Sequence, residues 1–317
     1  MPNSSPSNIL HPISNLLMIR PVNFGFNEET AHSNAFQDKE FGIKNKENAQ
    51  KIAVKEFDEF VEKLRNEGIK VLIIEDTLEP ATPDSIFPNN WISFHENGTI
   101  VTYPMEAHNR RLERREDIIQ TIENQFIVNQ KIDLTSFEKE GKYLEGTGSM
   151  VLDRTNKIAY ACLSPRTNSE VLNQFGEQLG YEMVVFKAVD SAGKAIYHTN
   201  VLMCVATDFV VICLDAIPDK NERDLVKKTI EMTNKKLIEI SFSQMNKFAG
   251  NMLELTGNDN TKYLVMSDSA FESLSENQIT IFEKYCKIIH SDLSMIEGNG
   301  GGSARCMMAE VLLEVKN

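Results

Sequence analysis

The sequence repeats one pattern of short apolar segments, and this repeat restricts the fold more than any other feature. Two apolar runs with a short connection predict a hairpin, and each hairpin is followed by an amphipathic helix and one more apolar run. The hairpins begin near residues 91, 149, 201 and 251, so successive copies lie 50 to 58 residues apart. A nearly constant period of this size indicates a modular architecture in which each copy is a ββαβ unit.

Four copies lie between residues 91 and 290. Their hairpin strands are predicted at 91–94 and 100–103, 149–153 and 158–163, 201–205 and 209–214, and 252–255 and 263–266. Helices are predicted near 111–125, 169–179, 222–234 and 276–285, and the strands that follow them at 126–128, 183–189, 237–241 and 287–290.

The two ends of the chain supply a fifth copy. Its hairpin strands are predicted at 307–314 and 16–20, its helix at 48–68 and its last strand at 71–75. A closed ring of five modules uses all of these segments, whereas a solenoid or an open sheet would leave the two ends apart. The completion of one module by both ends therefore favours closure.

A polar residue or segment precedes the first strand of each module. These positions are Asn90, residues 145–148, Asn200, Asn251 and Cys306. In a closed radial array, equivalent strand ends meet near one end of the central axis. We therefore expect these residues to face a common pocket although they are far apart in sequence.

Cys306 follows the glycines Gly300, Gly301 and Gly302 and precedes an apolar run. Glycines let the backbone adopt positive φ and let a ligand approach closely. The loop by itself is more typical of a tight turn beside an inert, buried thiol, because free cysteines usually behave as small hydrophobic residues. The shared pocket changes this interpretation and makes Cys306 a candidate nucleophile.

His198 and Glu145 are candidate partners of the thiol. His198 and Asn200 are two residues apart, and in an extended strand this spacing points both side chains the same way. A free thiol has a pKa of about 8.5, so only a small fraction of it is thiolate at neutral pH. A neighbouring histidine can lower this pKa and thereby activate the thiol. The thiolate would attack an electrophilic carbon, and His198 would protonate the leaving nitrogen. Glu145 would hold either His198 or a cationic substrate.

Composition excludes several classes of function. The net charge of −13 and the pI near 5.0 argue against binding to nucleic acid or to anionic membranes, which requires basic surface. No apolar run approaches the length of a membrane span. Five scattered cysteines without a CxxC pair disfavour disulfides and structural zinc and favour a cytoplasmic protein. The other four, Cys162, Cys204, Cys213 and Cys286, lie in or beside apolar runs and are predicted to be core residues.

These residues resemble the guanidino-group modifying superfamily, the penteins, which includes arginine deiminases, dimethylarginine hydrolases and amidinotransferases. The chain is most similar to the bacterial amidinotransferase-like branch named citrulline-utilisation hydrolase. The segments that match are residues 87–91, 105–111 with Glu113, 144–149, 164–167, 198–200 and 300–306, and they follow the order of the family.

The resemblance implies a five-bladed α/β propeller of ββαβ modules with pseudo-fivefold symmetry. It also implies roles for three residues. Cys306 is the nucleophile, His198 is the general acid and base, and Glu145 is the carboxylate of the family's Glu-Gly-Gly-Asp-like turn. Arg166 matches the arginine that binds the substrate's α-carboxylate, for which a guanidinium is suited. Arg110 and Arg111 are weaker candidates for the same task, with exposed helical arginines as the alternative. No metal or organic cofactor is implied.

Two positions depart from the arginine-converting relatives. This chain has Asn90 and Asn200 where those relatives carry aspartates that bind the substrate guanidinium. An amide can both donate and accept hydrogen bonds, but it offers a cation no ion pair. A neutral ureido group suits paired asparagines better, so the sequence favours a citrulline-like substrate over arginine.

The leading hypothesis is a cysteine hydrolase of a ureido or guanidino C–N bond in a free, small amino acid. An amidinotransferase and a non-catalytic amino-acid-binding protein are the alternatives. We expect one catalytic domain over residues 14–317 after a flexible segment, residues 1–13. The sequence leaves open whether the chain forms a homo-oligomer. It also leaves open whether the polar segment 23–47 is a lid over the pocket or a surface loop.

Overall fold

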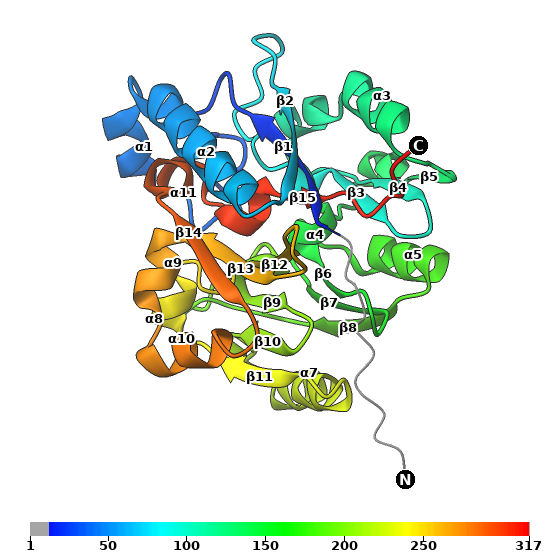
Figure 1. The fold of residues 1–317 in the computed structure, drawn as a ribbon, viewed down its shortest axis with the longest axis vertical. Helices are drawn as coiled ribbons and strands as arrows, with labels where there is room; N and C mark the ends of the chain where they lie inside the picture. The colour runs from blue at the N-terminus through cyan, green and yellow to red at the C-terminus, as the bar shows by residue number, and fades with distance from the viewer. Residues whose placement is uncertain (1–12, 317) are drawn as a thin grey trace.

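The computed structural model describes residues 13–316, and five three-stranded sheets form a ring in it. The colours of Figure 1 follow the blades around the ring, and the C-terminal end of the chain returns to β1, where the ring began. The predicted five-bladed α/β propeller is confirmed by this architecture.

Each blade contains three strands, and we number the blades along the chain. The strands are β1 (Asn15–Arg20), β2 (Lys70–Glu75) and β15 (Ala309–Glu310) in blade 1; β3 (Ile92–His95), β4 (Thr99–Thr102) and β5 (Gln130–Asp133) in blade 2; β6 (Val151–Asp153), β7 (Ile158–Cys162) and β8 (Glu182–Phe186) in blade 3; β9 (Met203–Val205), β10 (Phe209–Ile212) and β11 (Lys236–Glu239) in blade 4; and β12 (Leu253–Thr256), β13 (Lys262–Ser267) and β14 (Lys287–Ser291) in blade 5.

All five blades have the same pairing. The first strand is antiparallel to the middle strand, and the middle strand is parallel to the third, which follows a helical crossover. Blade 1 is closed by the C-terminal strand β15, which pairs with β1 at Leu16↔Glu310 and Leu17↔Ala309. The first strands β15, β3, β6, β9 and β12 are equivalent edge strands, and we call them the inner strands.

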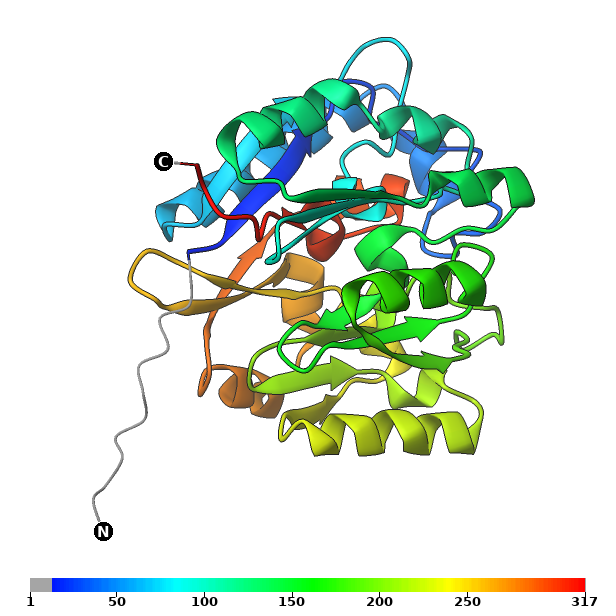
Figure 2. The ribbon, with the colours of Figure 1, turned by 90° about the vertical axis from the view of Figure 1, so that its right-hand side faces the viewer.

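The crossover helices are amphipathic and cover the outer strands, as the helices at the periphery of Figure 2 show. The main crossover helices, one for each blade, are α2 (Ala49–Asn66), α3 (Glu116–Gln125), α5 (Ser169–Leu179), α7 (Lys220–Met232) and α10 (Glu276–Phe282). Asn168 and Asp219 cap the first turns of α5 and α7 with their side chains, as helix N-termini require. Helix α7 contacts both β8 and β11, so it bridges two blades.

Short helices complete the fold. They are α1 (Lys39–Asn45), α4 (Gly146–Ser149), α6 (Thr199–Leu202), α8 (Phe242–Met245), α9 (Asp268–Ser273) and α11 (Ser294–Gly300), with 3-10 turns η1 (Pro88–Asn90), η2 (Asn109–Glu113), η3 (Thr135–Glu140), η4 (Leu214–Ala216) and η5 (Ala304–Met307).

Two details of the sequence prediction are wrong. The third strand of blade 2 is β5, Gln130–Asp133, and not residues 126–128, where Phe126 makes only an isolated bridge to Val315. The strands predicted to start at 149 and 201 start two residues later, because α4 and α6 precede them as helical turns. The predicted flexible segment lies outside the described residues except for Ile13, and the assignment of residues 14–317 to one domain stays a prediction.

Among residues 13–316, no helix is long and apolar enough to cross a membrane.

The apolar core is a series of clusters between neighbouring blades. Along β1, Leu16 and Met18 belong to the cluster shared with α2 and blade 5, whereas Leu17 and Ile19 belong to the cluster shared with α3 and blade 2. Alternate residues of a strand point to opposite faces, so β1 is buried on both sides. Strand β1 of blade 1 therefore packs against both neighbouring blades, blade 5 on one face and blade 2 on the other.

We predict that Leu16→Ala and Leu17→Ala each destabilise the protein by about 2–5 kcal/mol, because each creates a cavity on a different face of β1. Leu78→Ala is the control: Leu78 is 69% exposed, and its loss should change the free energy of unfolding by less than about 0.5 kcal/mol. Chemical denaturation measures all three. Equal values for the buried and exposed positions would contradict the closed ring.

Candidate active site

The predicted site residues lie where the inner strands begin. Asn90 ends η1 before β3, Glu145 immediately precedes α4 and then β6, and His198 immediately precedes α6 and then β9. Asn251 precedes β12, and Cys306 lies in η5 before β15. The ring thus brings five segments from five blades to one place, as the repeat predicts.

The Cys306 thiol is 3% exposed and is contacted by two amides. The Nδ2 groups of Asn200 and Asn251 each donate to its Sγ at 3.3 Å. The other amide atom of Asn251 accepts the backbone N–H of Arg305 at 3.0 Å, which fixes the turn that carries the thiol. Two amide N–H groups, from the segments that precede β9 and β12, are therefore directed at the sulfur.

The other cysteines are buried in the core, as predicted. Burial raises the pKa of Cys162 and Cys213 to about 11, and that of Cys204 and Cys286 to about 12. These four thiols are therefore protonated at neutral pH and are unsuited to nucleophilic attack.

His198 and Glu145 form a buried pair, in which Nε2 of the imidazole lies 2.8 Å from Oε2 of the carboxylate. Of the two partners that the sequence left open for Glu145, the structure brings His198 into contact. The other carboxylate oxygen accepts the backbone N–H of Glu106 at 3.0 Å. Because Nε2 faces a carboxylate, it carries the proton, and Nδ1 keeps the free lone pair.

Charges around this pair fix its protonation. Burial lowers the pKa of His198 to about 4 although Glu145 opposes the change, and the cations Arg166 and Arg110 lower it further. Burial acts to raise the pKa of the Glu145 carboxyl, but Arg166 and the hydrogen bond with His198 outweigh it and hold that pKa well below its usual value. At neutral pH the pair is a neutral imidazole beside a carboxylate.

Gly148 leaves the space in which His198 and Asn90 meet. A Cβ atom at this position would lie 2.5 Å from Asn90 Nδ2 and 2.7 Å from His198 Nδ1. Real Cβ contacts are longer than this, so only glycine lets the imidazole and the amide approach the turn. His198 and Asn200 also reach the site differently from the prediction, because Asn200 lies in helical turn α6 and not in an extended strand.

Arg110 is buried and bound by acidic and amide groups. Its guanidinium pairs with Glu113 through two bonds of 2.9 and 3.0 Å, and its Nη1 donates to Asn90 Oδ1 at 2.8 Å. The interpretation of Arg110 as an exposed helical arginine is wrong. Arg111 points elsewhere: it donates to backbone oxygens of Met105 and Glu106 and lies 3.6 Å from Glu138.

Arg166 is fully buried at the other side of the pair. Its Nη1 lies 3.5 Å from Glu145 Oε2, and its guanidinium stacks over the ring of Tyr197 at 4.9 Å. Its Nε and Nη2 donate to Ser33 Oγ at 3.0 and 2.7 Å, and Nη2 also donates to Thr30 O at 3.0 Å.

The segment 23–47 covers the site, which favours the lid over the surface loop. Besides Thr30 and Ser33, its Asn34 donates to Gly300 O at 3.1 Å, and its Gln37 donates to Asn299 O at 3.0 Å. These bonds join the segment to the glycine-rich loop before Cys306. The cavity that Asn34 borders with His198 and Cys306 is only about 10 Å³, room for one water molecule.

Asp84 is a residue of this cavity that the sequence analysis missed. Its Oδ2 accepts hydrogen bonds from Asn27 at 2.7 Å and Thr30 at 3.2 Å, but its Oδ1 has no hydrogen-bond partner in the described part of the chain. Burial raises the pKa of this carboxyl, and Arg110 opposes the change. In the sequence, its position in the segment that leads into Asn90 was the feature that could have indicated a place at the site.

Asn251 was recognised as an equivalent position without being given a role, although it contacts Cys306 directly. Tyr197, whose ring borders the cavity and whose hydroxyl donates to Gly301 O at 2.5 Å, gave no signal beyond its place next to His198. Between Ile13 and Lys316 no group of three or more His, Cys, Asp or Glu side chains could hold a metal ion.

Comparison with known proteins supports the superfamily that the motifs indicate. Residues 20–313 match a sequence-family model described as "N,N dimethylarginine dimethylhydrolase, eukaryotic". A search of curated protein sequences found no match.

Three solved structures have the same fold at low sequence identity. The N-terminal domain of ArgZ, an arginine dihydrolase of the ornithine–ammonia cycle in cyanobacteria, is 17% identical with a TM-score of 0.71, over 95% of this chain and 98% of that one. AgrE with L-arginine is 16% identical with a TM-score of 0.74, over 96% of this chain but only 41% of AgrE. The dimethylarginine dimethylaminohydrolase from Pseudomonas aeruginosa, in complex with citrulline, is 14% identical with a TM-score of 0.66, over 94% and 99%.

We predict that His198 stays neutral well below the ordinary histidine range. The unfolded chain binds a proton at His198 near pH 6.5 and the folded chain near pH 4, so this residue's contribution to stability is complete above about pH 6.5. It is lost progressively as the pH falls towards 4. NMR titration of the imidazole gives the pKa directly, and denaturation at each pH gives the loss of stability. In His198→Gln the free energy of unfolding should fall less between pH 6.5 and pH 4 than in the wild-type protein, because the variant has no imidazole to protonate at this position. An NMR pKa near 6.5 would contradict the buried, cation-flanked pair.

Proposed function

Since this chain belongs to the N,N dimethylarginine dimethylhydrolase family, we propose that it is a cysteine hydrolase that breaks a C–N bond in the ureido or guanidino group of a free amino acid. The chain is a hydrolase of non-peptide C–N bonds of arginine-like compounds, as its family is. The proposal concerns its residues and its substrate. One observation carries it: Cys306 and His198 line the same small cavity, and the His198 imidazole is paired with the Glu145 carboxylate.

Cys306 is the nucleophile of the proposed reaction. As its sulfur attacks the ureido or guanidino carbon, the thiol proton moves to the neutral imidazole of His198. The imidazolium that forms is stabilised by Glu145, and the positive charges of Arg166 and Arg110 keep His198 from holding this proton beforehand. His198 then gives the proton to the leaving nitrogen, and the C–N bond breaks.

Water completes the reaction. His198 takes a proton from a water molecule that attacks the S-linked carbon, and the C–S bond breaks with release of the Cys306 thiolate. With citrulline, the two steps consume one water molecule and release one amine and a carbamic acid. The carbamic acid then loses carbon dioxide as its remaining C–N bond breaks, so the final products are ornithine, ammonia and carbon dioxide. Either C–N bond of the ureido group gives these products. An amine in place of water would give a transferase, the alternative that the sequence left open.

Two charged side chains are suited to the amino-acid end of the substrate. Asp84 has an unpartnered carboxylate oxygen at the cavity, which can accept the α-ammonium group. Arg166 can bind the α-carboxylate in place of Ser33 and Thr30, which occupy its donors in this structure. Because Thr30 and Ser33 belong to the lid, residues 23–47, we propose that the lid opens for substrate and closes over it.

The reactive end of the cavity favours a neutral group. Asn200 and Asn251 present N–H donors to the sulfur, and Asn90 is bound by the cation Arg110. A guanidinium here would meet amides and a positive charge, whereas a ureido group offers a carbonyl acceptor and N–H donors. We therefore propose citrulline or a close analogue as the preferred substrate, with arginine less favoured.

We expect the purified protein to release ornithine and ammonia from L-citrulline, and to do so with a higher kcat/KM than it shows with L-arginine. Amino-acid chromatography and an ammonia assay measure both. Conversion of arginine alone would contradict the preference for a ureido group. Transfer of a group to an added amine such as glycine, without ammonia release, would identify a transferase.

Cys306→Ala should lower kcat by at least about 10³-fold without lowering stability, because it removes the nucleophile but little volume. Cys286→Ala, which removes a buried thiol in blade 5, is the matched control and should keep its activity. Glu145→Gln should lower kcat about 10²–10⁴-fold through His198. Full activity of Cys306→Ala would remove this cysteine from the mechanism.

We predict that Asn200→Asp shifts the preference towards a cationic substrate. The new carboxylate would lie beside Cys306 Sγ and would accept from a guanidinium while repelling the thiolate. The ratio of kcat/KM for arginine to that for citrulline should rise about tenfold or more, while the absolute rate with citrulline falls. An unchanged ratio would show that Asn200 does not set the specificity.

A further inference from the structure

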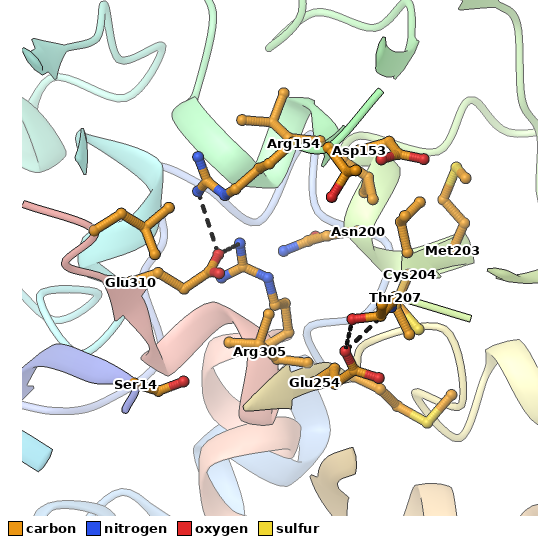
Figure 3. A pocket seen from close by; sticks show the side chains of 18 of the residues that line it. Ser14, Asp153, Arg154, Asn200, Met203, Cys204, Thr207, Glu254, Arg305 and Glu310 are labelled. Atoms are coloured by element: carbon orange, nitrogen blue, oxygen red, sulfur yellow. Dashed lines mark hydrogen bonds and ion pairs between the residues drawn. The ribbon is translucent and has the colours of Figure 1, made fainter. Parts of the chain in front are cut away.

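A second pocket of about 210 Å³ lies at the opposite ends of the inner strands. The site around Cys306 is formed where these strands begin, whereas the second pocket extends along them, from Asn200, Met252 and Arg305 near their starts to residues at or just beyond their ends. These are Glu96 after β3, Asp153 to Thr155 at the end of β6, Val205 to Thr207 at the end of β9, Glu254 and Thr256 in β12, and Glu310 and Leu312 at and after β15. We call it the rear pocket (Figure 3).

Charged side chains of both signs line the rear pocket, and Figure 3 shows the two arginines around Glu310 and, apart from them, Glu254. Arg154 and Arg305 both lie 3.3 Å from the same oxygen of Glu310, so two cations share one carboxylate. Glu254 accepts from the backbone and hydroxyl of Thr207 with one of its oxygens. Lys235 and Asp153, which lie 3.5 Å apart, also line the pocket, so both a pair of arginines and an acidic group with a free oxygen are available to a ligand.

Two acceptors beside the pocket lack donors. Glu254 Oε2 and Asn200 Oδ1 are buried, and neither has a hydrogen-bond partner within residues 13–316. Both residues line the rear pocket, and Asn200 is 1% exposed. Buried acceptors of this kind are nearly always paired in folded proteins, so their partner is expected to be a donor that enters the pocket.

We propose that the rear pocket binds a small zwitterionic α-amino acid. Its carboxylate would pair with Arg154 and Arg305, and its ammonium group would donate to Glu254 Oε2 and Asn200 Oδ1. The pocket is smaller than the 300–1,000 Å³ typical of sites for drug-sized ligands, which fits an amino acid with a short side chain. Exposed residues Glu96, Thr155 and Thr207 lie at its mouth.

The rear pocket is joined to Cys306 through two residues. Asn200 lines the rear pocket, and the Nδ2 of its amide donates to Cys306 Sγ at 3.3 Å. Arg305 is the chain neighbour of Cys306, and its guanidinium donates to Met308 O at 2.7 Å. A ligand that binds Asn200 Oδ1 holds this amide with its donor towards the sulfur, so the bound amino acid changes the reactivity of Cys306.

Titration calorimetry of the full chain with L-alanine tests the binding. We expect millimolar or tighter affinity, and binding of acetate or methylamine at least about tenfold weaker, because each carries only one of the two charges. Glu254→Gln, a nearly isosteric change, and Arg154→Gln should weaken alanine binding about tenfold or more. Asp84→Asn, on the lid side, should leave it unchanged. Thermal unfolding checks that each variant is folded.

Several results would overturn the proposal: absence of alanine binding, equal binding of acetate, or loss of binding in Asp84→Asn instead of in the rear-pocket variants.

The coupling between the rear pocket and Cys306 is tested by the rate at which iodoacetamide alkylates Cys306, followed by mass spectrometry of the peptide that contains it. Saturating alanine should change this rate at least about twofold in the wild-type protein and not in Glu254→Gln, and an unchanged wild-type rate would refute the coupling. Neither experiment uses a substrate, so both stand whether or not citrulline is hydrolysed.

Discussion

The structure depends on one geometric constraint, which is that the inner strands of five blades all begin at the same end of a common axis. A single module could present a thiol, an imidazole or an amide, but no module contains more than a part of the site. Closure of the ring by β15 and β1 brings Cys306 from the last residues of the chain beside Asn200, Asn251 and the His198–Glu145 pair. The same constraint creates the rear pocket, because strands that begin together also end together.

Burial makes the electrostatics of the site decisive. Glu145 faces His198, Arg166 and Arg110, so one carboxylate compensates several groups that would be costly to bury alone. This arrangement keeps the imidazole neutral and the carboxylate charged. A neutral imidazole can accept the proton of a thiol, and a nearby carboxylate can stabilise the product of that transfer. The amides around the sulfur add donors without adding charge.

The repeat predicted most of the fold, because hydrophobic periodicity reports which faces are buried, and burial between blades is what holds the ring together. The strand at 130–133 was missed because only Ile132 in it is buried and its other residues are polar. The helical turns α4 and α6 were missed because a turn of four residues has no measurable periodicity. The ring brings most of the predicted site residues together, but not Arg111. Those that meet are Cys306, His198, Glu145, Asn90, Asn200, Arg166 and Arg110. Asp84 and the contacts of the lid could not be predicted, since they depend on how a loop of irregular structure folds across the ring.

The central claim is that Cys306 forms a covalent bond to the substrate carbon. Rapid acid quenching of the protein with L-citrulline or L-arginine, followed by mass spectrometry of the peptide that contains Cys306, tests it most directly. We predict an adduct on Cys306 that appears during turnover, disappears when substrate is exhausted, and accumulates when the breakdown of the S-linked intermediate is slowed. Continuous product formation with no adduct on Cys306 at any time, or an adduct on another residue, would contradict the account.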